Sequence, residues 1–188
     1  VILAAGQGKR MRSALPKVLQ PLAGKPVLAH VLARSRELGA DDICVVYGHG
    51  GDAVKAAFPD SDIRWALQAE QLGTGHAVKQ GMPETPEQNQ VLVLTGDAPL
   101  LTVSTLKRFL AEASSHEMAV LTVDKDDPSG YGRIVRHEGG VKCIVEQKDT
   151  TEEQHKITEI NSGVILCPGD KLRGWLNNLD TDNSQGEY

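Results

Sequence analysis

A glycine-rich and basic loop, residues 3–12 (L-A-A-G-Q-G-K-R-M-R), follows the first apolar run of the chain. At Gly6 and Gly8 no side chain keeps an anion away from the backbone N–H groups. Three cations stand in the same loop: Lys9, Arg10 and Arg12. The dinucleotide-binding fingerprint does not fit, because Met11 stands where its third glycine is required, and the Walker A pattern does not fit either. We interpret the loop as a phosphate-binding loop; the alternative is a plain turn with solvated charges.

A further cation follows in L-P-K-V-L, residues 15–19. Pro16 favours extended backbone in the residue before it, and the apolar residues around Lys17 hold that lysine against the expected sheet. Lys17 can therefore reach the other side of the polyphosphate that the first loop binds.

A single carboxylate, Asp97, follows the apolar run V-L-V-L in the segment 91–100 (V-L-V-L-T-G-D-A-P-L). Gly96 ends the expected strand, so Asp97 emerges at its carboxyl end, where open α/β sheets bind ligands. One carboxylate suits Mg²⁺, which keeps several waters and takes its other ligands from substrate phosphates. The alternative is an aspartate that caps a turn or helix before Pro99.

The segment 65–77 (W-A-L-Q-A-E-Q-L-G-T-G-H-A) offers groups that could recognise a base. The Gln68 amide carries a donor and an acceptor, which match the imide edge of uracil but not the edge of cytosine. Gly73 and Thr74 stand at an expected helix N-terminus, where a ligand can approach the backbone. An ordinary helix start with a surface glutamine is the alternative. We expect His76 to be structural, because no histidine has metal-ligand spacing.

Three polar groups stand at the edges of expected strands in the second half of the chain. They are the backbone of Gly132 in S-G-Y-G-R, Glu146 in I-V-E-Q-K and Asn161 in E-I-N-S-G. A carboxylate and an amide that converge on a pocket can bind the hydroxyl and acetamido groups of a sugar. Solvated surface residues would look the same in the sequence.

Short apolar runs alternate with amphipathic stretches in the first half. The runs predict strands at 1–3, 43–47, 63–67 and 91–94, and the stretches predict helices at 26–38, 52–58, 74–82 and 104–113. This alternation predicts an α/β fold with a mainly parallel sheet covered on both faces.

The second half has shorter runs separated by turn residues, at 118–123, 133–136, 141–145 and 160–166, before a helix at 170–179. They predict antiparallel strands added to the parallel core. We therefore expect a single domain over 1–188, with a nucleotide-binding part at 1–115 and a sugar-binding part at 116–188.

The 188 residues are 40% apolar and 24% charged, and they carry a formal net charge of −5. Residues 1–36 hold seven Lys or Arg and no acid, which indicates local anion binding rather than a nucleic-acid surface. No apolar run is long enough to span a membrane, so we expect a cytoplasmic protein. Cys44, Cys143 and Cys167 lie in apolar runs without C-x-x-C spacing and are expected to be packed thiols.

Taken together, L-A-A-G-x-G-x-R-M, L-P-K, Q-A-E-Q-L-G-T-G-H-A, G-D-x-P-L, G-Y-G-R-I, V-E-x-K-D and E-I-N-x-G occur in one order. The chain resembles, over essentially its whole length, the N-terminal uridylyltransferase domain of the bacterial bifunctional N-acetylglucosamine-1-phosphate uridylyltransferase and glucosamine-1-phosphate acetyltransferase. The resemblance implies a Rossmann-like nucleotidyltransferase fold. It also implies transfer of a uridylyl group from UTP to N-acetyl-α-D-glucosamine 1-phosphate, with Mg²⁺, to give UDP-N-acetylglucosamine and pyrophosphate for peptidoglycan, cell-wall and lipopolysaccharide synthesis.

The resemblance also implies roles for the matching residues. The catalytic residues would be Arg10, Lys17 and Asp97, with Asp97 as the Mg²⁺ ligand. The nucleotide would contact Leu3, Ala4, Ala5, Gly6, Lys17, Gln68, Gly73 and Thr74. The sugar phosphate would contact Thr95, Gly96, Asp97, Gly132, Glu146 and Asn161. Some family members have Tyr where Thr95 stands, so an aromatic contact is not expected there.

The family's second protein ligand to Mg²⁺ is an Asn beyond residue 188, and its C-terminal left-handed β-helix acetyltransferase domain lies there too. We therefore expect a chain truncated at both ends and nearly inactive alone, and a full-length protein that also acetylates glucosamine 1-phosphate with acetyl-CoA as a homotrimer. Two alternatives stay open: a related transferase for another base or sugar, and a non-catalytic nucleotide-sensing module.

Overall fold

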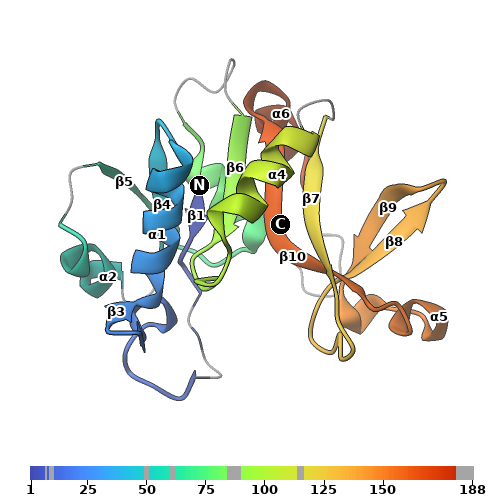
Figure 1. Ribbon diagram of the computed structural model, residues 1–188, viewed down its shortest axis with the longest axis horizontal. Helices are drawn as coiled ribbons and strands as arrows, with labels where there is room; N and C mark the ends of the chain where they lie inside the picture. Colours follow the sequence, from blue (N-terminus) through green and yellow to red (C-terminus); the bar gives the residue numbers. More distant parts are fainter. Residues whose placement is uncertain are drawn as a thin grey trace.

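Four parallel strands form one half of the main sheet in the computed structural model (Figure 1). In chain order they are β1 (Ile2–Leu3), β4 (Ile43–Tyr47), β5 (Ile63–Leu67) and β6 (Gln90–Thr95). They lie side by side in the order β5-β4-β1-β6. The structure describes residues 1–6, 8, 11–48, 51–59, 62–83, 90–113 and 117–180. The expected parallel sheet is confirmed, and its strands begin and end within a residue or two of the predicted bounds.

Helices cover both faces of these strands. On one face lie α1 (Val27–Leu38), α2 (Gly51–Ala57) and α4 (Val103–Ala113); on the other lie α3 (Thr74–Gly81) and α6 (Gly169–Asn177). Strand β6 shows why helices must cover both faces of the sheet. Leu94 belongs to the core under α1, α2 and α4, while Val91 and Val93 belong to the core under α3 and α6. Alternating side chains of one strand point to opposite faces, so a strand with apolar residues throughout requires cover on both.

Antiparallel strands extend the sheet, as the second half of the sequence predicts. They are β7 (Ala119–Asp124), β8 (Arg133–His137), β9 (Gly140–Val145) and the long β10 (Glu159–Pro168). The second half of β10 lies between β6 and β7, while its first half lies between β7 and β8. Strand β10 therefore joins the parallel half to the β8–β9 hairpin.

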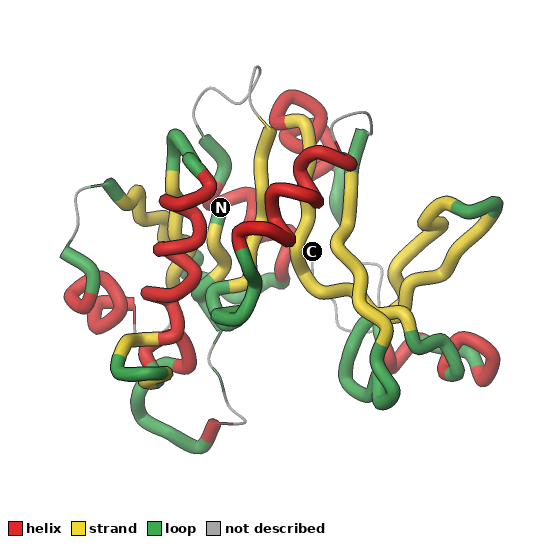
Figure 2. The backbone as a smooth tube through the Cα atoms, in the orientation of Figure 1, coloured by secondary structure: helices red, strands yellow, loops and turns green. Residues whose placement is uncertain are grey.

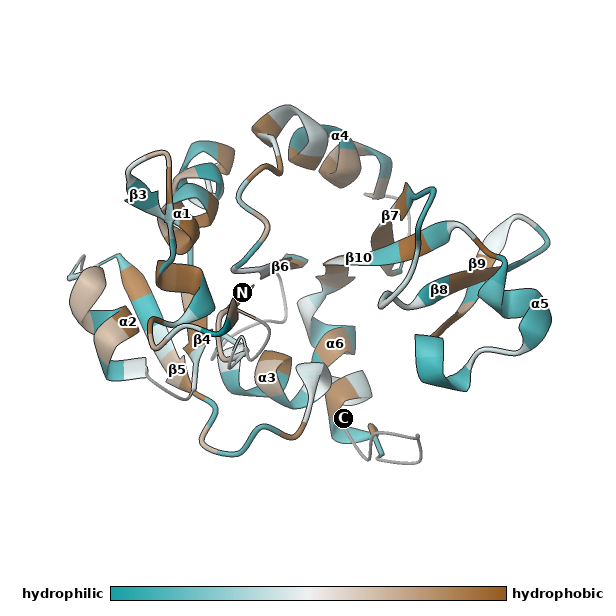
Figure 3. Cartoon of the chain, turned by 90° about the horizontal axis from the view of Figure 1, so that it is seen from below, coloured by the Kyte–Doolittle hydropathy of each residue, from teal (hydrophilic) through white to brown (hydrophobic). Residues whose placement is uncertain are grey.

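The smaller elements lie at the edges of this sheet. They are η2 (Lys17–Leu19), the hairpin β2 (Pro21–Leu22) and β3 (Lys25–Pro26), η3 (Gln147–Asp149) and α5 (Glu152–His155). Figure 2 shows the β8–β9 hairpin and α5 standing apart from the helix-covered half. In Figure 3, α5 is hydrophilic along its length, whereas α3 and α6 carry apolar residues toward the sheet.

Two findings qualify the composition-based expectations. Cys44 and Cys167 are buried, and burial raises the pKa of both thiols, to about 11 for Cys167. Cys143 is exposed on β9, so the expectation that all three thiols are packed is wrong. Strand β9 lies at the outer edge of the sheet, and its first four residues are all exposed, so both faces of the strand meet solvent at Cys143 and its neighbours. Within the described ranges, no helix combines the length and the apolar character needed to cross a bilayer.

Candidate functional site

The ends of β1, β4 and β6 bring the first motifs of the chain together. The backbone N–H of Gly96 donates to the carbonyl oxygen of Leu3 at 2.8 Å, and that of Ala4 donates to the carbonyl oxygen of Val46 at 2.8 Å. Leu3 also lies opposite Thr95 in the parallel register. The start of the first loop and the segment that carries Asp97 therefore leave the sheet as neighbours, at the carboxyl ends of parallel strands.

Lys17 and Asp97 meet at this edge. The Lys17 ammonium group donates to Oδ2 of Asp97, and both side chains are partly exposed, by 43% and 34%. Lys17 begins the short helix η2, whose Val18 and Leu19 are buried in the core. The apolar residues that follow Lys17 thus fix its backbone, as the sequence predicts, while its charged end stays accessible.

Gly8 places the first loop against Lys17. Its backbone has φ +59°, and a Cβ atom there would lie 2.8 Å from the Cβ of Lys17. A residue with a side chain would be strained in this conformation and would also displace Lys17. The first loop therefore approaches Lys17 as closely as a glycine allows. Arg10, the other expected catalytic cation, lies outside the described residues.

Gln68 is 4% exposed and directly follows β5. Its Nε2 donates to the carbonyl oxygen of Gly73 at 3.0 Å and lies 3.2 Å from Nδ1 of His76. Both amide hydrogens are therefore used within the protein. The expectation that the donor and the acceptor of this amide both meet the base is revised: the side-chain oxygen is the free end, since no hydrogen bond to it exists among the described residues.

The segment after Gln68 is tied back to the first loop. Nε2 of Gln71 donates to the carbonyl oxygen of Ala5 at 2.6 Å. Helix α3 then begins at Thr74, with Gly73, which has no side chain to cap the helix, as its N-cap. The bond from Gln71 fixes the distance between the expected phosphate side and the expected base side of the nucleotide.

The three polar groups of the second half also come together. The Asn161 backbone N–H donates to the carbonyl oxygen of Gly132 at 2.9 Å, and a Cβ atom on Gly132 would lie 2.9 Å from Oε1 of Glu146. They come from the segment just before β8, the end of β9 and the middle of β10. The Glu146 carboxylate and the backbone of Asn161 therefore both lie next to Gly132.

A bulge in β10 connects this cluster to the edge that carries Asp97. The pairing of β10 with β7 shifts register between Asn161 and Val164. Within the bulge the Gly163 N–H donates to Oδ1 of Asn161 at 2.8 Å, and a Cβ atom on Gly163 would lie 2.8 Å from Cγ2 of Thr95. Bulges re-aim side chains next to functional sites. This one orients Asn161 while it packs against the end of β6.

An ion pair stands near the start of the same strand β10. Arg136 holds Glu159 through two hydrogen bonds, from Nε at 2.7 Å and from Nη2 at 2.6 Å. The hydrogen bond from Arg136 is the main cause that lowers the pKa of the Glu159 carboxyl below its ordinary value. This bidentate pair fixes β8 against β10 close to Asn161.

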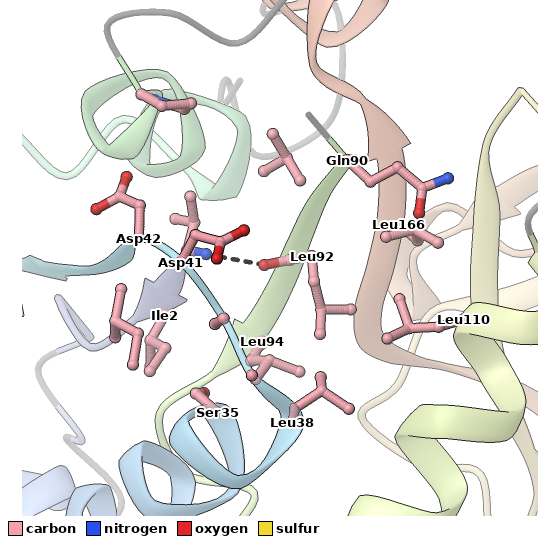
Figure 4. A pocket seen from close by; sticks show the side chains of 16 residues that line it. Ile2, Ser35, Leu38, Asp41, Asp42, Gln90, Leu92, Leu94, Leu110 and Leu166 are labelled. Atoms are coloured by element: carbon pink, nitrogen blue, oxygen red, sulfur yellow. Dashed lines mark hydrogen bonds between the residues drawn. The ribbon is translucent and has the colours of Figure 1, made fainter. Parts of the chain in front are cut away.

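An apolar cavity of about 390 Å³ lies at the opposite edge of the sheet (Figure 4). It opens between the starts of β4 and β6 and is lined by side chains such as Leu38, Leu92, Leu110 and Leu166. The charged residues of its lining are Asp41 and Asp42, which would repel phosphates. The cavity is therefore not the nucleotide site that the motifs indicate.

The site fits a magnesium ion held jointly with substrate. Asp97 supplies an accessible carboxylate, and the described residues contain no cluster of three or more His, Cys, Asp or Glu that could bind a metal by themselves. Mg²⁺ bound through one carboxylate takes its remaining ligands from water and substrate phosphates. Asp97 is thus the residue that would hold the ion.

A model of the MobA-like NTP transferase domain matches residues 1–170 of the chain. The chain belongs to this family. The matched range contains the first loop and also Lys17, Gln68 and Asp97.

Curated relatives of this NTP transferase domain agree with the motifs. The chain is 54% identical to the bifunctional protein GlmU of Azoarcus sp. (strain BH72) over 189 residues and 57% identical to that of Paraburkholderia phymatum over 190 residues. Each alignment covers 100% of this chain and 42% of the relative, so the chain spans less than half the length of these relatives. The resemblance to the bifunctional family is thereby confirmed.

Solved structures support the fold. A putative glucose-1-phosphate thymidylyltransferase from Bacillus anthracis in complex with a sucrose superposes with a TM-score of 0.76 at 19% identity, over 98% of this chain and 76% of that one. HddC from Yersinia pseudotuberculosis complexed with GMP-PN gives 0.67 at 24% identity, over 100% and 80%. The Rossmann-like nucleotidyltransferase fold of this NTP transferase domain is confirmed.

Three residues that no motif predicted connect the segments of the candidate site in this NTP transferase domain: Gln71, His76 and Arg133. Gln71 and His76 were not assigned a contact, although both stand in the segment that contains Gln68. Arg133 is 1% exposed and donates to the carbonyl oxygens of Pro128 and Tyr131, which fixes the turn before Gly132. A sequence pattern predicts that an arginine in a strand is an exposed surface charge. The position of Arg133 within the motif G-Y-G-R was the one feature of the sequence that could have indicated another role.

Proposed function

We propose that this domain transfers a uridylyl group from UTP to N-acetyl-α-D-glucosamine 1-phosphate and releases pyrophosphate. The observation that carries the proposal is the meeting of Lys17 with Asp97 at the carboxyl edge of the sheet, beside the phosphate loop. The identity to bifunctional GlmU proteins over the whole chain supports the choice of reaction within the family.

In this proposal a phosphate oxygen of the sugar phosphate attacks the α-phosphorus of UTP in line, and pyrophosphate leaves. The nucleophile is already an anion, so no general base is required; the site must bring two anions together and stabilise charge. Lys17 would bind a phosphate oxygen, and two unit charges about 4 Å apart interact by roughly 4 kcal/mol at an effective dielectric of 20. An ion on Asp97, when bound, supplies further positive charge to the phosphates.

The two parts of the chain divide the substrates in this proposal. Residues 1–115 would hold UTP through Leu3 to Gly6, Lys17, Gln68, Gly73 and Thr74. Residues 116–188 would hold the sugar through Gly132, Glu146 and Asn161, with Thr95 and Gly96 between the parts. The acetamido group is the feature of the sugar that an amide such as Asn161 can recognise by hydrogen bonds.

The test is release of pyrophosphate by the full-length protein with Mg²⁺. UTP, CTP and TTP are each combined with N-acetylglucosamine 1-phosphate, glucosamine 1-phosphate and glucose 1-phosphate. We expect the highest kcat/KM for UTP with N-acetylglucosamine 1-phosphate. A different best pair would identify a related sugar nucleotidyltransferase instead. Nucleotide binding without pyrophosphate release would identify a sensing module.

We also propose that the full-length protein acetylates glucosamine 1-phosphate through residues beyond this chain, and that it assembles as a homotrimer through them. The relatives are called bifunctional, and this chain spans 42% of their length. Acetyl-CoA consumption with glucosamine 1-phosphate, together with the mass of the particle in solution, tests both statements.

A further inference from the structure

The side chains of Gln68, His76 and Gln80 form a row that begins just after β5 and runs along helix α3 toward its last turn. Nε2 of Gln68 lies 3.2 Å from Nδ1 of His76, and Nε2 of Gln80 lies 3.1 Å from Nε2 of the same imidazole. Gln68 is buried, whereas Gln80 is exposed. The row therefore runs from the expected base side of the site out to solvent.

The chemistry of the imidazole decides which way each amide points. An amide nitrogen only donates, so Nδ1 of His76 must accept from Gln68 and cannot carry a proton. A neutral imidazole has one N–H, which is then on Nε2 and needs an acceptor. The exposed Gln80 can turn its amide and offer its oxygen.

The Gln68 amide has no such freedom. Its nitrogen also donates to the carbonyl oxygen of Gly73 at 3.0 Å, and a carbonyl oxygen is always an acceptor. If this amide turned over, its oxygen would face the carbonyl oxygen of Gly73, and its contact with His76 would survive only if the imidazole proton moved to Nδ1. Gly73 therefore sets the direction of the amide, and His76, with its proton on Nε2, accepts the second amide hydrogen, so the oxygen is the free end.

We propose that His76 is a specificity-determining positioning residue: by accepting from Nε2 of Gln68, it keeps the Gln68 oxygen toward the base and so selects a base whose ring nitrogen carries a hydrogen. This inference rests on the proposed transfer from UTP. Uracil presents N3–H, which donates to an oxygen. Cytosine presents a bare N3, which an oxygen repels and an amide N–H would attract.

Gly73 supplies the complementary donor. Its backbone N–H makes no hydrogen bond within the part of the chain that the structure describes, and it belongs to the residue whose carbonyl anchors Gln68. The carbonyl oxygen next to N3–H in uracil can accept from such a group, whereas cytosine carries an amino group at that place. The acceptor of Gln68 and the donor of Gly73 therefore together match the imide edge of uracil. The sequence alone had suggested that the Gln68 amide supplies both groups.

The test compares kcat/KM for UTP and CTP in the full-length protein carrying His76→Leu or His76→Asn. Leucine fills a similar space but cannot accept a hydrogen bond, so we expect the preference for UTP to fall roughly three- to tenfold, the loss of one hydrogen bond. Asparagine can place an oxygen near the position of Nδ1, so we expect it to restore most of the preference. Lys79→Gln, at an exposed position of α3 outside this row, should in contrast leave the preference within twofold.

A double substitution separates positioning from general packing. With Gln68→Ala already present, His76→Leu should change the preference by less than twofold, because the amide that His76 orients is gone. Equal losses for UTP and CTP in His76→Leu, or no difference between Leu and Asn, would overturn the inference. If the unmodified protein itself did not prefer UTP, the proposed function would fail instead, which separates the two results.

Discussion

Lys17 and Asp97, 80 residues apart in the chain, form an ion pair at the carboxyl edge of the sheet. The pair places the Lys17 ammonium group directly beside a carboxylate of the kind that can bind a metal ion. Both side chains are more than a third exposed, so the ion pair contributes little to the free energy of unfolding, about 1 kcal/mol or less. Lys17 can therefore exchange the carboxylate for a phosphate oxygen at little cost, which leaves Asp97 free for a metal ion.

Lys17→Ala in the full-length protein should lower turnover by roughly 10³-fold, on the scale of losses seen when a phosphate-stabilising cation is removed. The free energy of unfolding should change by about 1 kcal/mol or less, because the pair is exposed. Lys25→Ala is the control, since Lys25 is an exposed cation in β3. Pyrophosphate release and urea unfolding measure the two effects. Near-normal turnover in Lys17→Ala would exclude its catalytic role.

Gly8→Ala tests whether the close approach of the first loop positions Lys17. Alanine at φ +59° is strained by about 1 kcal/mol, and its Cβ would lie 2.8 Å from the Cβ of Lys17. Gly24→Ala is a matched control, because Gly24 has φ +79° but no heavy atom within 4 Å of a Cβ there. We expect both variants to lose stability through backbone strain, Gly8→Ala somewhat more because Lys17 must also shift, while only Gly8→Ala loses turnover by tenfold or more, as roughly 1 Å of misplacement can cost 10²-fold. Equal activity in both would contradict this reasoning.

Much of the fold follows from periodicity in the sequence. In β6, alternate side chains are buried under the helices on the two opposite faces of the sheet. The uninterrupted apolar run at 91–94 predicts such a strand, because every one of its residues must be buried. The carboxyl edge of parallel strands then predicts that Asp97 and the first loop are neighbours. These inferences need only the type and spacing of residues.

Other features depend on contacts that no local pattern encodes. The bulge between Asn161 and Val164 exists because β10 pairs with β7 in two registers, which the sequence of one strand does not reveal. The bond from Gln71 to Ala5 joins residues 66 positions apart. Cys143 illustrates the reverse error: an apolar run predicts burial, but the first four residues of this edge strand are exposed on both faces.

Gln71→Ala should weaken nucleotide binding more than turnover. The variant loses the hydrogen bond from Nε2 to the carbonyl oxygen of Ala5, which links the two expected nucleotide contacts. We expect KM for UTP to rise roughly five- to tenfold, the effect of one hydrogen bond, with kcat within threefold. Glu70→Ala, an exposed neighbour, serves as the control. A fall in kcat with no change in KM would show that Gln71 does not act through ground-state binding of the nucleotide.

The Arg136–Glu159 pair predicts how stability depends on pH. The hydrogen bond that Glu159 accepts from Arg136 lowers the pKa of the Glu159 carboxyl in the folded chain. A carboxyl whose folded pKa lies below its unfolded value, about 4.3, contributes stability that is present above that value and is lost as the pH falls through the folded pKa. Arg136→Gln should therefore destabilise the chain at pH 7, by about 1 kcal/mol or less because Arg136 is partly exposed.

The difference between Arg136→Gln and the unmodified chain should shrink as the pH falls below about 4, toward the part that comes from the hydrogen bond of Arg136 Nη1 to the carbonyl oxygen of Gly139, which does not depend on the charge of Glu159. Urea unfolding at pH 7, 5, 4 and 3 measures it. Arg34→Gln is the control, because Arg34 holds Glu37 through a single contact on the surface of α1 and should change stability less at every pH. A difference for Arg136→Gln that stays constant from pH 7 to pH 3 would mean that Arg136 stabilises the chain through packing of its side chain, and that the charge of Glu159 plays no part.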